Sequence, residues 1–354
     1  MADATSPEGW AERWGQSAVA RPSTLTVDVH THILVPESAE MTRPHFTPEM
    51  DPRTFYSAPE TKELNQRFYG LVQDKYTDPG TRLADMDALG IDIQLLGLSP
   101  FHYFYWADAD LAPRVASVQN ERIAEIARID PRRFVGLGTL PMAHPAAAVE
   151  EAHRLAGEYG FPGVYLGADI TGIDLDHEMF EPVWDALEEL GLVAVLHPAG
   201  FTHAERLTDY YLVNVIGMPL SSTLAVTRMI LAGVFERHPD LRMLVVHGGG
   251  YLTFYSARTD HAFRHRPELR HHIDRLPSEY LSRLYYDITV FDPGMIEHLV
   301  RAYGADHVLL GTDYPFDMGL PDPLALVAGA SLTEEERDLV VGGSAVRLFG
   351  LEVE

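Results

Sequence analysis

The sequence predicts a (β/α)8 barrel, the TIM-barrel class of α/β fold, with a long insertion after strand 1. Eight apolar segments of strand length alternate with helical segments along the chain. The strands are apolar along their whole length, which is typical of a parallel sheet covered by helices. Eight such units favour a barrel. The open-sheet alternative is weakened because no Gly-x-Gly-x-x-Gly loop follows strand 1.

The chain is expected to form an N-terminal arm, residues 1–23, and a single barrel domain, residues 24–354. No low-complexity linker or block of charge divides it. We expect the arm to be loosely held. Residues 33–78 form the insertion, because they are rich in proline, threonine and charged residues and lack sustained periodicity. One short helix is expected near residues 60–73, and long insertions of this kind are usually functional.

Strand 1 is the apolar run that begins at Leu25, and regular alternation resumes at Asp78. Asp78 and Pro79 are typical of a helix start, and Gly90 of a helix end. After this helix, strands are expected at residues 91–98, 133–140, 163–168, 192–198, 241–250, 284–288 and 307–315. Helices with an apolar face are expected at residues 110–129, 145–160, 177–191, 221–239, 251–265, 293–304 and 333–350.

Composition excludes several classes of partner and site. The net charge of −25 is spread along the chain, which argues against nucleic acid and anionic membranes as partners. There is no cysteine, so any metal must be bound by His, Asp or Glu. No apolar run approaches the roughly 18 residues that span a membrane, and the N-terminus lacks the pattern of a signal peptide. We therefore expect a soluble cytoplasmic protein.

Five polar residues stand at the ends of predicted strands. His30 and His32 end strand 1 and, being two residues apart, point to the same face. His197, His247 and Asp313 end strands 5, 6 and 8. One such histidine is more often an ordinary polar neighbour than a ligand. All five share the carboxyl-terminal rim, where barrel enzymes carry their active sites, and together they indicate a metal site.

Four of these residues make a suitable ligand set: His30, His32, His197 and Asp313. Three nitrogens and one carboxylate oxygen suit Zn²⁺, with water completing the shell, and Mn²⁺, Fe²⁺ or Co²⁺ would also fit.

The lysine count favours one metal ion per chain. Some two-metal barrels bridge their ions with a carboxylated lysine at a mid-barrel strand end. Here the only lysines, Lys62 and Lys75, lie in the insertion. His247 then remains for acid–base chemistry, since a neutral imidazole beside a metal-bound water can take up its proton and return it to the substrate. The alternative is that His247 is a fifth ligand.

Four segments in this order, VDVHTH, AVLHP, VVHGGG and LLGTDYPF, resemble the amidohydrolase superfamily. The resemblance is most specific to the branch of metal-dependent decarboxylases that contains 2-amino-3-carboxymuconate-6-semialdehyde decarboxylase. It covers roughly residues 25–350 and is strongest in the last third, for example in ARTDHAFRHR and PSEYLSRLYYDITVFDPG.

The resemblance implies the roles of the site residues. One zinc ion per chain would be bound by the four ligands above, and His247 would be the acid–base, with Asp313 as its catalytic neighbour. Arg258 would bind a substrate carboxylate, which suits the planar fork of a guanidinium. Because this arginine can come from the other subunit in the family, the resemblance also implies a homodimer.

The sequence departs from this family mainly in the residues expected to touch the substrate. A second substrate-binding arginine of the family lies in the insertion, and the nearest candidate, Arg67, is about three residues out of register. Tyr211, or its neighbour Tyr210, falls near a tryptophan of the family. Phe101, in the aromatic loop SPFHYFYW, would stack on a planar substrate or simply pack under the insertion.

Two activities fit these residues. The first is a non-oxidative decarboxylase of an aromatic or carboxymuconate-type carboxylic acid. The second is a hydrolase or hydratase that uses the same metal-bound water as a nucleophile. The same ligands serve both, so the fold does not discriminate between them.

Overall fold

Eight parallel barrel strands are present in the computed structural model, which describes residues 5–352. The third strand is split in two by Leu137, and a short antiparallel hairpin, β6 (Asp169–Ile170) and β7 (Ile173–Asp174), follows the fourth. The barrel strands are β1 (Val27–Ile33), β2 (Ile93–Leu98), β3 (Phe134–Gly136) with β4 (Gly138–Thr139), β5 (Gly163–Leu166), β8 (Val193–Leu196), β9 (Met243–Val245), β10 (Tyr285–Asp287) and β11 (Val308–Leu309).

Hydrogen bonds connect these strands into a ring. β1, β2 and β3 pair in order, and β4, β5, β8, β9, β10 and β11 pair in order, all in parallel. Leu137, the residue between β3 and β4, donates from its N to Leu96 O of β2 (3.0 Å). Val29 N of β1 donates to Leu310 O, the residue after β11, so the last strand meets the first (3.0 Å). The predicted (β/α)8 barrel is therefore confirmed.

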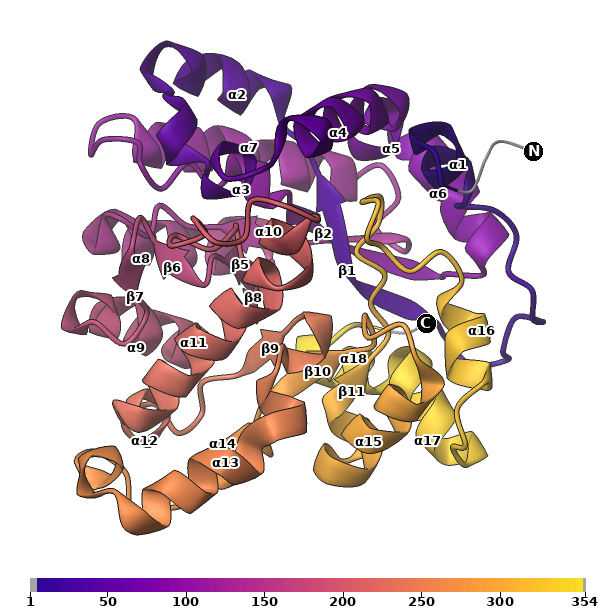
Figure 1. Cartoon of the computed structure of the whole chain (residues 1–354). Helices are drawn as coiled ribbons and strands as arrows, with labels where there is room; N and C mark the ends of the chain where they lie inside the picture. The colour runs from indigo at the N-terminus through magenta and orange to yellow at the C-terminus, as the bar shows by residue number, and fades with distance from the viewer. Residues whose placement is uncertain (1–4, 353–354) are drawn as a thin grey trace.

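Helices surround the strands (Figure 1). Several predicted helices are broken into shorter pieces, and α10, α14 and α16 were not predicted. The helices after the insertion are α6 (Pro79–Leu89), α7 (Ala112–Ala127), α8 (Pro145–Arg154), α9 (Glu181–Leu190), α10 (Leu212–Val215), α11 (Gly217–Leu231), α12 (Val234–Arg237), α13 (Leu252–His265), α14 (Pro277–Leu281), α15 (Pro293–Tyr303), α16 (Pro323–Ala328), α17 (Glu334–Asp338) and α18 (Ser344–Phe349).

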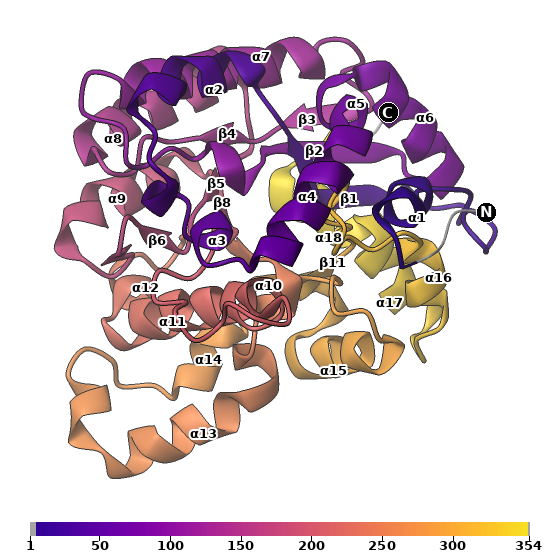
Figure 2. The same ribbon diagram turned by 45° about the horizontal axis from the view of Figure 1, so that its top comes forward.

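The insertion is mostly helical, where the sequence predicted a single short helix. It contains α2 (Pro36–Thr42), α3 (Pro52–Phe55), α4 (Pro59–Leu71) and α5 (Gln73–Thr77). Three of these begin at a proline, whose fixed φ angle and missing N–H suit the first turn of a helix. The helices gather at the top of Figure 1 and come forward over the strands in Figure 2.

The N-terminal segment is packed against the barrel, so the expectation of a loosely held arm is wrong for its described part. α1 (Pro7–Glu12) contacts α4. Trp14 is only 4% exposed, and its ring meets that of Tyr314 edge-on at 4.9 Å. Arg13 donates to Phe316 O at 2.5 Å. These contacts hold the N-terminal segment against the loop that follows β11.

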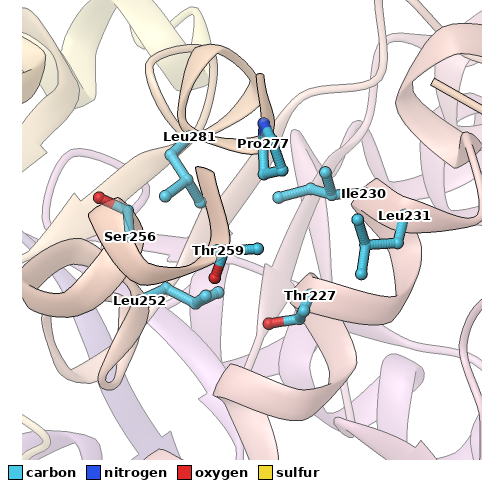
Figure 3. A pocket seen from close by; sticks show the side chains of 8 residues that line it. All are labelled: Thr227, Ile230, Leu231, Leu252, Ser256, Thr259, Pro277 and Leu281. Atoms are coloured by element: carbon cyan, nitrogen blue, oxygen red, sulfur yellow. The ribbon is translucent and has the colours of Figure 1, made fainter. Parts of the chain in front are cut away.

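The pair α13 and α14 projects from the barrel in both views (Figures 1 and 2). Asp260 accepts hydrogen bonds from Ser278 N (3.0 Å) and Ser278 Oγ (2.7 Å), which join the two helices. Apolar side chains, among them Ile230, Leu252 and Leu281, attach the pair to α11 around a void of about 10 Å³ (Figure 3). This volume is about one water-sized sphere, so the contact is close-packed.

One stretch of the described chain, Leu212–Leu231, is long and apolar enough to cross a membrane by length and composition alone. Its mean hydropathy is 1.2. The sequence expectation that no apolar run approaches the length of a membrane span is therefore wrong for this stretch. Half of it is buried within the protein, and core helices of soluble proteins pass the same test. It includes α11, which covers the barrel.

Candidate metal centre

The four predicted ligands converge at one end of the barrel. His30 and His32 lie within β1 and are fully buried. His197 directly follows β8, and Asp313 lies four residues beyond β11. One potential ligand atom from each of the four residues lies within 4.8 Å of the others. Residues far apart in the chain therefore meet because their strands are parallel and end at the same rim.

Asp313 is at the centre of the cluster. Its Oδ1 lies 2.9 Å from His32 Nε2, 3.3 Å from His30 Nε2 and 3.9 Å from His197 Nε2. Burial opposes ionisation of this carboxyl, yet the surrounding imidazoles, His30 foremost, hold its pKa well below the usual range. Asp313 is therefore a carboxylate whose charge is directed at three histidine nitrogens.

The imidazoles are oriented by hydrogen bonds at their other nitrogen. His30 Nδ1 donates to Asp287 Oδ2 (2.6 Å), and His197 Nδ1 donates to Pro198 O (2.8 Å). His32 Nδ1 faces Leu98 O at 3.4 Å. Such partners fix which nitrogen carries the proton and leave Nε2 directed at the centre of the cluster, as they do for metal-binding histidines generally.

These residues fit a divalent cation. Nε2 of His30 and of His197 is buried without a hydrogen-bond partner among residues 5–352. Burial lowers the pKa of His32 to about 4 and that of His197 well below its usual range, so both offer a neutral nitrogen lone pair. An unpaired buried nitrogen is costly, and a bound cation would supply the missing partner.

His30 is held differently, between two carboxylates. Burial lowers its pKa, but Asp313 and Asp287 outweigh that effect and raise the pKa to about 10. The proton thus favoured on Nε2 occupies the direction that a cation would take. A cation at the centre would therefore replace this proton as the positive partner of Asp313.

His247 lies beside the cluster but is less enclosed. Its Nε2 is 3.8 Å from Asp313 Oδ2, and its side chain is 18% exposed, whereas those of His30 and His32 are fully buried. Its ring centroid is 5.2 Å from that of His30 and 5.0 Å from that of His197. His247 is therefore near the cluster and also open to the adjoining cavity.

Strained backbone marks the same region. Seven described residues other than glycine have a positive φ angle, and four of them line one cavity: Tyr211 (60°), His247 (56°), Phe291 (61°) and Asp313 (61°). L-residues adopt this conformation at a cost of roughly 1–3 kcal/mol each, and such residues gather at functional sites.

The cavity has a volume of about 640 Å³ and is bounded by His197, His247 and Asp313. This is within the range of small-molecule sites. A second cavity, of about 720 Å³, adjoins it on the far side of Pro100 and is lined by aromatic residues 101–106.

The predicted substrate residues are found at different distances from the cavity. Tyr211 lines it. Phe101 lines the second cavity, and its ring packs on Phe316, which lines the first, at 5.6 Å between centroids. Arg67 is not among the lining residues, because it extends outward from α4 to pair with Glu8 at 2.6 Å. Arg258 is exposed on α13 and is not among the residues that line the cavity of its own chain.

Three residues of the site were not predicted: Arg53, Asp287 and Asp317, the last of which also lines the cavity. Arg53 lines the cavity at the start of α3, with its guanidinium carbon 3.3 Å from the centroid of the Phe101 ring. Asp287 orients His30 and also accepts from Gly248 N, next to His247, at 2.8 Å. Asp287 is the last residue of β10. The strand-end argument applied to the segment YYDI would therefore have found it.

Comparisons with known proteins agree with this geometry. The amidohydrolase family model matches residues 27–351. A 2-amino-3-carboxymuconate-6-semialdehyde decarboxylase of Dictyostelium discoideum is 31% identical, with 93% of this chain and 92% of that protein aligned. A gamma-resorcylate decarboxylase of Rhizobium sp. is 26% identical, with 92% and 98% aligned.

Solved structures share the fold. The 5-carboxyvanillate decarboxylase of Sphingomonas paucimobilis superposes with a TM-score of 0.83 at 24% identity, over 93% of this chain and all (100%) of that one. The manganese-bound enzyme of Novosphingobium aromaticivorans superposes with a TM-score of 0.82 at 23% identity, over 96% and 99%. The chain belongs to the amidohydrolase family, in its branch of carboxy-lyases, the metal-dependent decarboxylases.

Proposed function

We propose that this protein is a non-oxidative decarboxylase of an aromatic or carboxymuconate-type carboxylic acid. The observation that carries the proposal is the buried cluster His30, His32, His197 and Asp313, which opens beside His247 into a cavity of about 640 Å³. The curated relatives aligned over most of their length act, by their names, on acids of these two kinds.

We propose one Zn²⁺ per chain as the physiological cofactor. Three imidazole nitrogens and one carboxylate oxygen suit zinc. The manganese in a related decarboxylase makes Mn²⁺ the first alternative, and Fe²⁺ and Co²⁺ also accept such ligands. The cation, when bound, would supply Lewis acidity and positive charge for the electron density that builds up during C–C cleavage.

His247 is proposed as the acid–base. It stands at the boundary between the cluster and the cavity, where its Nε2 can reach a bound substrate. As an acid it donates a proton to the carbon that bears the carboxylate. The C–C bond then breaks, CO₂ leaves, and the bonding electrons restore the ring or diene. As a base it regains a proton from water before the next turnover.

Arg53 is proposed to hold the substrate carboxylate, in place of Arg67. Its guanidinium stands in the cavity wall, whereas that of Arg67 is used by Glu8. A guanidinium can bind a carboxylate through two parallel hydrogen bonds.

Arg258 is proposed to act across a homodimer. Large apolar side chains are exposed around the cavity mouth, including Tyr251 (37%), Phe254 (38%) and Phe291 (50%). A second copy of the chain packed on this surface would cover them and bring an arginine from its own α13 toward the cavity. We further propose that the protein is cytoplasmic and has no nucleic-acid or membrane partner.

A panel assay tests the proposed activity. Zinc-loaded protein is incubated with hydroxybenzoates and carboxymuconate-type acids, and released CO₂ is measured alongside hydrolysis of a lactone panel. We expect CO₂ from at least one acid and no lactone hydrolysis. Hydrolysis without any CO₂ would favour the hydrolase alternative and refute the proposal.

A further inference from the structure

Tyr211 and Asp317 form a hydrogen-bonded pair in the wall of the 640 Å³ cavity. The hydroxyl of Tyr211 donates to Asp317 Oδ2 at 3.0 Å, across 106 residues of sequence. Tyr211 lies in the segment after β8 that begins with His197, and Asp317 lies in the segment after β11 that contains Asp313. The pair thus joins two of the loops that deliver metal ligands.

The backbone around Tyr211 is strained to direct its side chain inward. Tyr210 and Tyr211 both have positive φ angles, 57° and 60°. The side chain of Tyr210 is 89% exposed, so its packing does not explain the strain. The result of the turn is the position of Tyr211 in the cavity wall. His247 and Asp313 have the same conformation in the same cavity.

Asp317 has an acceptor that the protein leaves unused. None of residues 5–352 donates a hydrogen bond to its Oδ1. The two nearby guanidinium groups are engaged elsewhere, since that of Arg13 donates to Phe316 O and that of Arg53 stacks on Phe101. This oxygen is therefore free to accept a hydrogen bond from a ligand in the cavity that Asp317 lines.

We propose that Asp317, oriented by Tyr211, accepts a hydrogen bond from a hydroxyl or amino substituent of the substrate, at a position away from the carboxylate that is lost. The proposal deepens the proposed decarboxylase function, on which it rests, by naming a substituted substrate class. Arg53 and Asp317 would orient the substrate between opposite charges, because the first attracts the carboxylate and the second requires a donor. No proton is transferred in this contact.

The test is a binding comparison on zinc-loaded protein. Calorimetry measures the affinity of each isomeric dihydroxybenzoate and of the analogue in which the second hydroxyl is a methoxy group, which cannot donate. We expect one isomer to bind about tenfold or more tightly than its methoxy analogue, the size of effect for a hydrogen bond to a charged group. Equal affinities within every pair would overturn the proposal.

Variants assign the preference to the pair. In Asp317→Asn the ratio of the affinity for the dihydroxybenzoate to that for its methoxy analogue should fall toward one. An amide oxygen accepts more weakly than a carboxylate, and the amide nitrogen can also donate to a methoxy oxygen. Tyr211→Phe should lower the ratio less, since it removes only the group that orients the carboxylate. The matched control is Asp292→Asn in the same cavity wall, where the carboxylate accepts from Met295 N at the start of α15 and asparagine preserves that cap.

If Asp317→Asn and Asp292→Asn changed the affinity ratio equally, the assignment of the preference to Asp317 would be refuted, because the change would then be a general effect of lost negative charge. Zinc content and thermal unfolding of each variant verify the fold. If Asp317→Asn does not fold, an unchanged ratio in Tyr211→Phe would be the contradicting result. The readout is independent of turnover: a retained hydroxyl preference without CO₂ release refutes the activity alone, and CO₂ release without the preference refutes this proposal alone.

Discussion

At the scale of single residues, the candidate metal site consists of four ligands and of side chains that orient them, such as Asp287 beside His30. His30, His32, His197 and Asp313 stand at strand ends, and parallel strands bring their ends together whatever the loops do. Arg53 lies in an insertion whose path depends on tertiary packing, so the sequence directed attention to Arg67 instead. The contact between Tyr211 and Asp317 depends on two loops and one strained turn, none of which leaves a periodic signal.

Asp287→Asn is expected to weaken metal binding about 10- to 100-fold, the usual cost of losing the partner that orients a metal-bound histidine. Asp287 accepts from His30 Nδ1, and an amide cannot hold that imidazole with the same charge. Chelator competition measures the zinc affinity.

The control for Asp287→Asn is Asp260→Asn, which removes another buried carboxylate, between α13 and Ser278. Zinc affinity should be unchanged in this control. Equal losses in the two variants would mean that Asp287 affects the metal only through general stability.

His30→Ala and His247→Ala should separate metal binding from catalysis. His30→Ala is expected to lose the metal, since it removes one of the four converging ligands. His247→Ala is expected to keep about one zinc per chain while turnover is abolished. Metal analysis and CO₂ release on the same samples decide this, and loss of zinc from His247→Ala would make His247 a fifth ligand.

At the scale of elements, the barrel was predictable because each strand and helix carries its own pattern. Apart from α4, which matches the helix predicted near residues 60–73, the insertion and the N-terminal segment were not, because their other helices are short and are stabilised by packing against the barrel rather than by a long periodic face. Trp14 shows this: its burial against Tyr314 connects residues 300 positions apart and leaves no local signal.

Trp14→Ala is expected to lower the free energy of unfolding by about 3–5 kcal/mol, because it leaves a large cavity behind the loop after β11. Trp10→Ala should cost less, since Trp10 is only half-buried against Phe68. Urea denaturation followed by circular dichroism gives both values. If Trp14→Ala were no more destabilising than Trp10→Ala, the N-terminal segment would not be an integral part of the fold.

At the scale of the whole molecule, the proposed role of Arg258 requires a second chain to complete the site. Arg258 is exposed on α13, which projects from the barrel (Figure 2), and is not among the residues that line the cavity of its own chain. The apolar side chains at the cavity mouth give a second copy a surface to cover, and a twofold dimer would let each chain complete the other.

Subunit mixing tests this arrangement. Arg258→Ala and His247→Ala homodimers should each be inactive. A mixed dimer has one intact site, so an equimolar mixture that has exchanged subunits should recover about a quarter of the wild-type rate. Steady-state CO₂ release measures the recovery. No recovery despite exchange, shown by tagged subunits, would mean that Arg258 does not act across the interface.

The central claim is that the bound acid loses its carboxylate and gains one proton at the same carbon. The most direct test is mass spectrometry of the product formed in heavy water by zinc-loaded protein. The account predicts CO₂ and a product that carries one deuterium at the vacated carbon, and neither should form with His247→Ala. A product that retains every carbon of the acid and has gained the elements of water would contradict the account.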